Sequence, residues 1–161
     1  MALIIEDGTV VAGANSFVTD AELQAYAAVR KVSLPAAQDD REALLVNAMD
    51  YIVSKEQDMK GARVSDAQEL PYPRHCVTIN GFDVPKDSIP PLLKQCQIES
   101  AIAANTLSLL PNESVQNVQT QKVDVLEISY FQGGSMTTVN LQAVDAKIKP
   151  LLKNNATMTR V

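Results

Sequence analysis

The sequence predicts a mainly α protein: a small helical bundle built on one long central helix, with a C-terminal β-hairpin extension. Two helical segments precede Gly61, and a third, 89–110, holds the longest run of apolar residues at helical spacing. After Pro111 the apolar period changes from helical to alternating, which is typical of strands. We expect one domain, residues 1–161, with a hairpin extension over 112–142 and a C-terminal tail over 151–161.

The first elements are predicted by local signals. Leu3 to Glu6 has the pattern of a short strand and is followed by a turn. Thr19 and Glu22 have the spacing of a capping box, so a helix is expected to run from Asp20 to about Lys31. A second amphipathic helix is expected to follow Asp39 and to end before Gly61.

The third helix is the central element of the predicted bundle. Five of the eight prolines lie between Gln68 and Leu110, and proline stiffens an extended chain because it fixes φ. Pro90 and Pro91 fit the first turn of a helix, where their missing N–H groups cost nothing. Two apolar stripes follow, one of which is the candidate subunit-interface set Ile98, Ile102, Asn105 and Leu109.

The C-terminal third alternates in two phases. Val123 and Val125 share one phase and Leu126 starts the other, which predicts a β-bulge between Val125 and Leu126. The reversal is expected at Gly133–Gly134, with a return strand over 137–141. A short helix through Val144, Ile148 and Leu151 is expected to be interrupted by Pro150.

Charge is unevenly distributed. The net charge of -5 argues against a dedicated nucleic-acid binder, since phosphate affinity comes mainly from clustered Lys and Arg. After Asp145 only basic charges occur, so the C-terminal tail is either a solvated end or a segment that docks on an acidic partner. The candidate docking residues are Leu151, Leu152, Lys153 and Arg160.

The residues do not indicate an enzyme. His75 is the only histidine and precedes Cys76, but consecutive side chains of an extended chain point to opposite faces, which suits proton transfer poorly. No spacing predicts a metal site, a cofactor site or a disulfide framework. No apolar run reaches the roughly 20 residues of a membrane span, and the short apolar start predicts a cytoplasmic, mature N-terminus.

Three basic residues form the candidate DNA-facing set: Lys60, Arg63 and Arg74. They lie near Tyr72, and an aromatic ring beside basic residues can stack a base. Acidic residues are interleaved with them, so a solvated loop is the simpler interpretation. An acidic protein can still surround DNA without gripping it.

Several segments resemble a family of tailed-phage head-to-tail connector adaptors, often labelled DnaT-like single-stranded-DNA-binding proteins. The resemblance begins with 2–9, Gly13 to Val18 and a following helix with Tyr26. It continues through Arg63-Val64-Ser65, Gln68, Leu70, Tyr72-Pro73-Arg74, Gly81, Val84-Pro85, Asp87, Ile89-Pro90 and Glu99. Many relatives carry Trp before the Pro-Arg pair, where this chain has Tyr72.

The resemblance implies a structural virion protein rather than an enzyme. It implies a homo-oligomeric ring, a dodecamer, that joins the portal to a tail or neck protein during genome packaging and ejection. Genome DNA would pass through the lumen without sequence specificity, in a neck assembled in the host cytoplasm, and the C-terminal tail would dock on the portal. The alternative is a single-stranded-DNA-binding module of the DnaT-like type, for which tight, salt-dependent oligonucleotide binding is expected.

Overall fold

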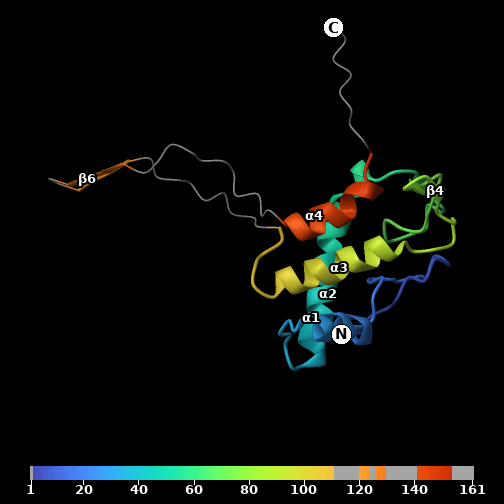
Figure 1. Cartoon of the computed structure of the whole chain (residues 1–161), viewed down its shortest axis with the longest axis horizontal. Helices are drawn as coiled ribbons and strands as arrows, with labels where there is room; N and C mark the ends of the chain where they lie inside the picture. The colour runs from blue at the N-terminus through green and yellow to red at the C-terminus, as the bar shows by residue number, and fades with distance from the viewer. Residues whose placement is uncertain (1, 111–119, 124–125, 130–140, 154–161) are drawn as a thin grey trace, which may run out of the picture. The chain divides into compact units, whose positions relative to one another are not determined.

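The computed structural model describes residues 2–110, 120–123, 126–129 and 141–153. The chain divides into two compact units, 1–109 with 141–161 and 110–140. The first unit contains the helices α1 (Asp20–Arg30), α2 (Gln38–Ser54), α3 (Pro91–Ala104) and α4 (Gln142–Ile148). It also contains the 3-10 turns η1 (Glu56–Asp58) and η2 (Lys149–Leu151). The helices and the connections between them can be followed in Figure 1.

Short antiparallel strand pairs complete the described structure. In the first unit β1 (Ala62–Arg63) pairs with β2 (Arg74–His75), and β3 (Thr78–Ile79) pairs with β4 (Phe82–Asp83). In the second unit β5 (Thr120–Val123) pairs with β6 (Leu126–Ser129). The described protein is therefore a mixed α and β structure.

The predicted fold class, a mainly α bundle on one long central helix, is wrong. The α3 helix has 14 residues and is shorter than α2, which has 17. It ends early because the polar turn after Ala104 takes over the last carbonyls: the amides of Thr106 and Leu107 both donate to the Ala103 carbonyl oxygen. The proline-rich segment before α3 contains the strand β2 and the whole β3–β4 pair rather than a plain connection.

The helix starts follow their local signals more closely. The capping box at Thr19 and Glu22 is present, and α1 runs from Asp20 to Arg30, as predicted to within one residue. The α2 helix begins at Gln38, just before Asp39. The predicted N-terminal strand is reduced to a single bridge between Ile5 and Ser16.

The predicted C-terminal hairpin has the wrong register. Val123 pairs with Leu126, so the segments before and after the predicted bulge pair with each other instead of forming one strand. The reversal predicted at Gly133–Gly134 and the return strand lie largely outside the described residues. The final helix ends at Ile148 and passes into η2, which contains Pro150, as predicted.

The core of the first unit forms where α3 packs against α2 and α4. Leu45, Ile52 and Leu93 are fully buried there. Buried Gln97 connects three segments: its amide oxygen accepts from the Phe17 amide at 2.9 Å, and its nitrogen donates to the Leu45 carbonyl at 3.1 Å. A polar group in such a core is stable because its hydrogen bonds are satisfied.

The N-terminal loop is packed tightly against the connection that leads into α3. Buried Glu6 accepts hydrogen bonds from the amides of Gly8, Val10 and Val11 at 2.8 to 3.0 Å. Gly8 has φ +113°, and a Cβ atom there would lie 2.1 Å from the Asp87 carbonyl oxygen. Only glycine fits this position without moving one of the two segments.

Candidate functional site

The three candidate DNA-facing residues come together on the segment that follows η1. Arg74 is buried, with 6% of its surface exposed. Its guanidinium donates to the carbonyl oxygens of Lys60 at 2.8 Å, Gly61 at 2.9 Å and Pro71 at 3.2 Å. Because a guanidinium has five fixed donors in one plane, it can hold several loop carbonyls at once. Arg74 therefore links the two ends of the irregular segment, because its acceptors lie at 60–61 and at 71.

Arg63 and Arg74 share the carboxylate of Glu56. Arg63 binds it with two hydrogen bonds of 2.6 Å and also donates to the Gln68 carbonyl, while Arg74 lies 3.2 Å from the nearer oxygen. Hydrogen bonding from Arg63 is the largest effect on the Glu56 carboxyl and outweighs burial, so its pKa is lowered. We call Glu56, Arg63 and Arg74 the Glu56 cluster.

Lys60 connects two more segments. Its Nζ donates to the Pro150 carbonyl at 2.8 Å and to the Thr78 carbonyl at 3.4 Å, and its backbone amide donates to the Leu151 carbonyl at 2.9 Å. The lysine thus joins β3 to η2. All three candidate DNA-facing side chains donate hydrogen bonds to oxygens of the protein itself, and these bonds brace the fold.

An exposed aromatic residue lies beside this braced segment. Asn80 and Gly81 have φ values of 51° and 85°, which gives β3 and β4 the two-residue reversal of a tight hairpin. Phe82 is 78% exposed and pairs across the hairpin with Ile79. The hairpin is held by the ladder and by a 3.0 Å hydrogen bond from the Thr78 hydroxyl to the Asp83 carboxylate.

Sequence reasoning missed Phe82 as a functional candidate. The signal was present, because Asn-Gly between alternating residues is the strongest short-range sign of a hairpin. The same region holds His75 and Cys76, both exposed, and no hydrogen bond joins these two residues in the described structure. Cys76 has φ 58°, so the strand β2 ends at His75.

The candidate docking tail is partly bound to its own chain. Leu151 is fully buried, and Leu152 forms a bridge with Met59. Lys153 is exposed, but its amide donates to the Asp58 carbonyl at 2.7 Å and its Nζ donates to a neighbouring carbonyl at 3.0 Å. Arg160 lies outside the described residues.

The candidate interface residues of α3 differ in exposure. Ile98 and Leu109 are buried, at 6% and 8% exposure, Ile102 is half-buried and Asn105 is exposed. Their role between subunits stays a prediction. Leu107, just beyond the helix, is 51% exposed and adds an apolar side chain near its end.

A second polar cluster ties three helices together. The Tyr26 hydroxyl donates to Glu99 at 2.6 Å, and Lys147 Nζ lies 2.7 Å from both the Tyr26 oxygen and Glu99. Burial alone would lower the pKa of Lys147, but the hydrogen bonds to Glu99 and Tyr26 outweigh it, so the pKa is raised. The Arg30 guanidinium lies 3.4 Å from the centre of the Tyr26 ring. With its groups mutually satisfied, this cluster fastens α1, α3 and α4.

Two further observations concern the described ranges alone. They contain no group of three or more His, Cys, Asp or Glu side chains placed to hold a metal ion. None of their helices is both long and apolar enough to cross a membrane.

Comparison with known proteins identifies the family. The family described as "Putative DnaT-like ssDNA binding protein" matches residues 1–161, and the chain belongs to this family. The match confirms the DnaT-like label in the resemblance drawn from the sequence. No curated protein and no solved structure matches the chain.

Proposed function

We propose that the chain is a non-catalytic module that binds single-stranded DNA, and that Phe82 on the β3–β4 hairpin stacks on a base. Membership of a family named for single-stranded-DNA binding supports the ligand class. The observation that carries the contact is the 78% exposure of Phe82 on a two-residue hairpin. Aromatic rings held rigidly in solvent are the stacking platforms of sequence-tolerant binders.

The Glu56 cluster sets the expected character of this binding. Its two guanidinium groups are held by a carboxylate and by carbonyls, so few phosphates would be neutralised there. Affinity should then depend on stacking more than on counterion release, with a shallow salt dependence. The net charge of -5 acts in the same direction.

The test compares Phe82→Ala with Val29→Ala, a matched loss of an apolar side chain that is 82% exposed on α1. Fluorescence anisotropy with a labelled oligothymidine measures affinity at two salt concentrations. Loss of one base stack costs about 1–3 kcal/mol, so Phe82→Ala should bind about 5- to 150-fold more weakly. Phe82→Trp should retain binding, and Val29→Ala should match the wild type. Equal affinity for Phe82→Ala and wild type would refute the stacking role.

The second candidate function is the structural adaptor implied by the resemblance: a ring in the neck of a tailed-phage virion, between portal and tail. It is favoured by the internal pairing of Lys60, Arg63 and Arg74 in an acidic chain. A wall that lets DNA slide should avoid strong phosphate contacts, because each one adds affinity and drag. In this role Phe82 and Leu107 would contact neighbouring protein.

Ring formation and portal binding can be tested separately from DNA binding. Electron microscopy of the protein, alone and with a portal, should show a closed ring; a monomer under both conditions would count against the adaptor. A tail deletion for portal binding should begin after Lys153, because Leu151 is fully buried and Lys153 donates to Asp58. Binding that survives this deletion would exclude Arg160 and its neighbours as the docking segment.

A further inference from the structure

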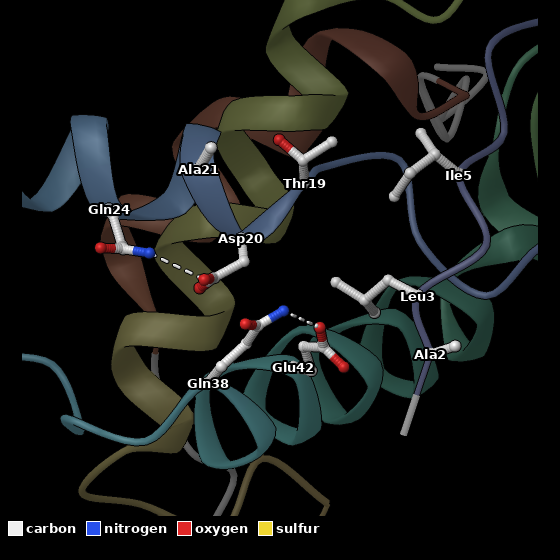
Figure 2. Close-up of a pocket in the computed structure, with 9 residues that line it drawn as sticks. All are labelled: Ala2, Leu3, Ile5, Thr19, Asp20, Ala21, Gln24, Gln38 and Glu42. Atoms are coloured by element: carbon white, nitrogen blue, oxygen red, sulfur yellow. Dashed lines mark hydrogen bonds between the residues drawn. The ribbon is translucent and has the colours of Figure 1, made fainter.

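A pocket of about 480 Å³ lies where the N-terminal segment meets the starts of α1 and α2. Figure 2 shows Leu3 and Ile5 from the N-terminal segment facing Gln38 and Glu42 from α2. Ala21 and other residues of α1 complete the lining. The pocket thus has aliphatic walls from the N-terminal segment and polar side chains from both α1 and α2.

Glu42 is incompletely hydrogen-bonded. Glu42 is buried, with 7% of its surface exposed, and its Oε1 accepts a hydrogen bond from Gln38 Nε2 at 2.8 Å. Its Oε2 is buried without a hydrogen-bond partner among the described residues. A buried carboxylate oxygen without a donor is costly, and it indicates a missing donor.

The neighbouring cation does not fill this role. The Arg41 guanidinium donates to the two oxygens of Asp20 at 2.7 and 2.8 Å and to the carbonyls of Pro35 and Ala36. Arg41 is close enough to Glu42 for the two charges to attract, but it donates no hydrogen bond to Glu42, whose one hydrogen-bond donor is the neutral Gln38 amide.

The amide groups of the lining leave the pocket rich in acceptors. Gln24 Nε2 donates to Asp20 at 2.7 Å, and Gln38 Nε2 donates to Glu42. Their amide oxygens accept no hydrogen bond from the described part of the chain. Gln24 and Gln38 are exposed, so water can satisfy their oxygens, and the Glu42 oxygen is the acceptor that a ligand would complete. A ligand that donates a hydrogen bond and carries a positive charge would match this carboxylate.

We propose that this pocket binds a primary ammonium or guanidinium group on an aliphatic stem, with the charged head at Glu42 and the stem against Leu3 and Ile5. The same chemistry is offered by a free alkylamine and by a lysine or arginine side chain of a partner protein. The proposal is independent of DNA binding, since none of the lining residues belongs to the Glu56 cluster or to the β3–β4 hairpin.

The test is an NMR titration of the full chain with n-butylammonium and n-butylguanidinium, with n-butanol as the uncharged control. Both cations should shift the amide signals of Leu3, Ala21 and Glu42, and should bind at least about tenfold more tightly than n-butanol. Equal binding of n-butanol would overturn the proposal, because the pocket would then select apolar shape alone.

Two variants and a control locate the site. Glu42→Gln removes the charge with little change of shape and should weaken cation binding about tenfold or more. Asp40→Asn makes the same charge change at an exposed position that does not line the pocket, so its affinity should stay within about twofold of wild type. Wild-type affinity in Glu42→Gln would overturn the proposal.

Ala21→Leu keeps the test decisive if Glu42→Gln fails to fold. Ala21 is exposed and lines the pocket, so a larger side chain should block both cations without disturbing the core. Unchanged binding in Ala21→Leu would refute the location. The source is identified with the peptide acetyl-Gly-Lys-Gly-amide: tighter binding than n-butylammonium indicates a partner's side chain, and weaker binding indicates a free amine.

Discussion

Replacing Arg74 should destabilise the protein far more than replacing Arg63, although both arginines bind Glu56. Arg74 is 6% exposed as a residue, whereas the Arg63 side chain is 35% exposed. Arg74→Met removes donors from three carbonyl oxygens and from one carboxylate oxygen. Arg63→Met removes the bidentate pair and the donor to the Gln68 carbonyl oxygen, but at a side chain that water already reaches.

The magnitude follows from the acceptors that are left behind. A buried acceptor without a donor costs about 1–3 kcal/mol, and breaking a buried ion pair costs about 3–5 kcal/mol. We expect Arg74→Met to lower the free energy of unfolding by about 4 kcal/mol, and Arg63→Met by about 1 kcal/mol because its site is partly exposed. Arg74→Lys keeps the charge but not the planar set of donors, so about 2 kcal/mol should be lost.

Urea denaturation followed by circular dichroism measures these differences. The midpoint should fall while the dependence of the unfolding free energy on urea stays unchanged, since the folded structure persists. Arg74→Met within about 1 kcal/mol of wild type would refute the bracing role. Weak oligonucleotide binding with unchanged stability would instead show that Arg74 faces DNA.

Three further predictions concern pH, a close approach and the second polar cluster. The pKa of Glu56 is lowered in the folded protein, so the ionised carboxylate stabilises the fold above the unfolded pKa of about 4.5. This stabilisation is lost as pH falls through the folded pKa. The urea midpoint of Glu56→Gln should therefore drop less between pH 6 and pH 3 than the midpoint of the wild type. Gly8→Ala should lower the free energy of unfolding by more than about 2 kcal/mol, because the added Cβ would collide with Asp87. Gly81→Ala should lower it by about 1 kcal/mol, because the added Cβ meets open space but the backbone has a positive φ. Equal thermal unfolding midpoints for the two variants would contradict this difference. Tyr26→Phe should cost about 1 kcal/mol, measured by urea unfolding, because its hydroxyl joins two charged side chains; an unchanged midpoint would show that the hydroxyl is dispensable.

Predictions from the sequence were best where the cause is local. The start of α1 depends on two residues three positions apart, Thr19 and Glu22, and their hydrogen bonds form as expected. The length of α3 was predicted poorly, since apolar spacing continues past Ala104 although the backbone does not. The polar turn after Ala104 competes for the same carbonyl oxygens, and the spacing of apolar residues does not reveal which hydrogen bonds form.

The candidate site shows the same limit at longer range. The sequence identified the segment of Arg63 and Arg74 but not the direction of their side chains, because Glu56 is supplied by a different element. Residues quoted for the family resemblance lie against one another in the fold: Tyr26 contacts Glu99, and Gly8 packs on Asp87. Such residues identify a family while leaving its ligand undefined.

The contrast between two glycines separates two kinds of constraint on this family. At Gly8 a side chain would collide with a backbone carbonyl, whereas at Gly81 an added Cβ meets nothing within 4 Å. Insertions and large labels should therefore be rejected at the first position and accepted at the hairpin tip. Folding constrains Asn80 and Gly81 through their positive φ values, but the exposed residues Phe82 and Asp83 are limited chiefly by what the hairpin touches, so differences among relatives at 82 and 83 will report changes of binding partner.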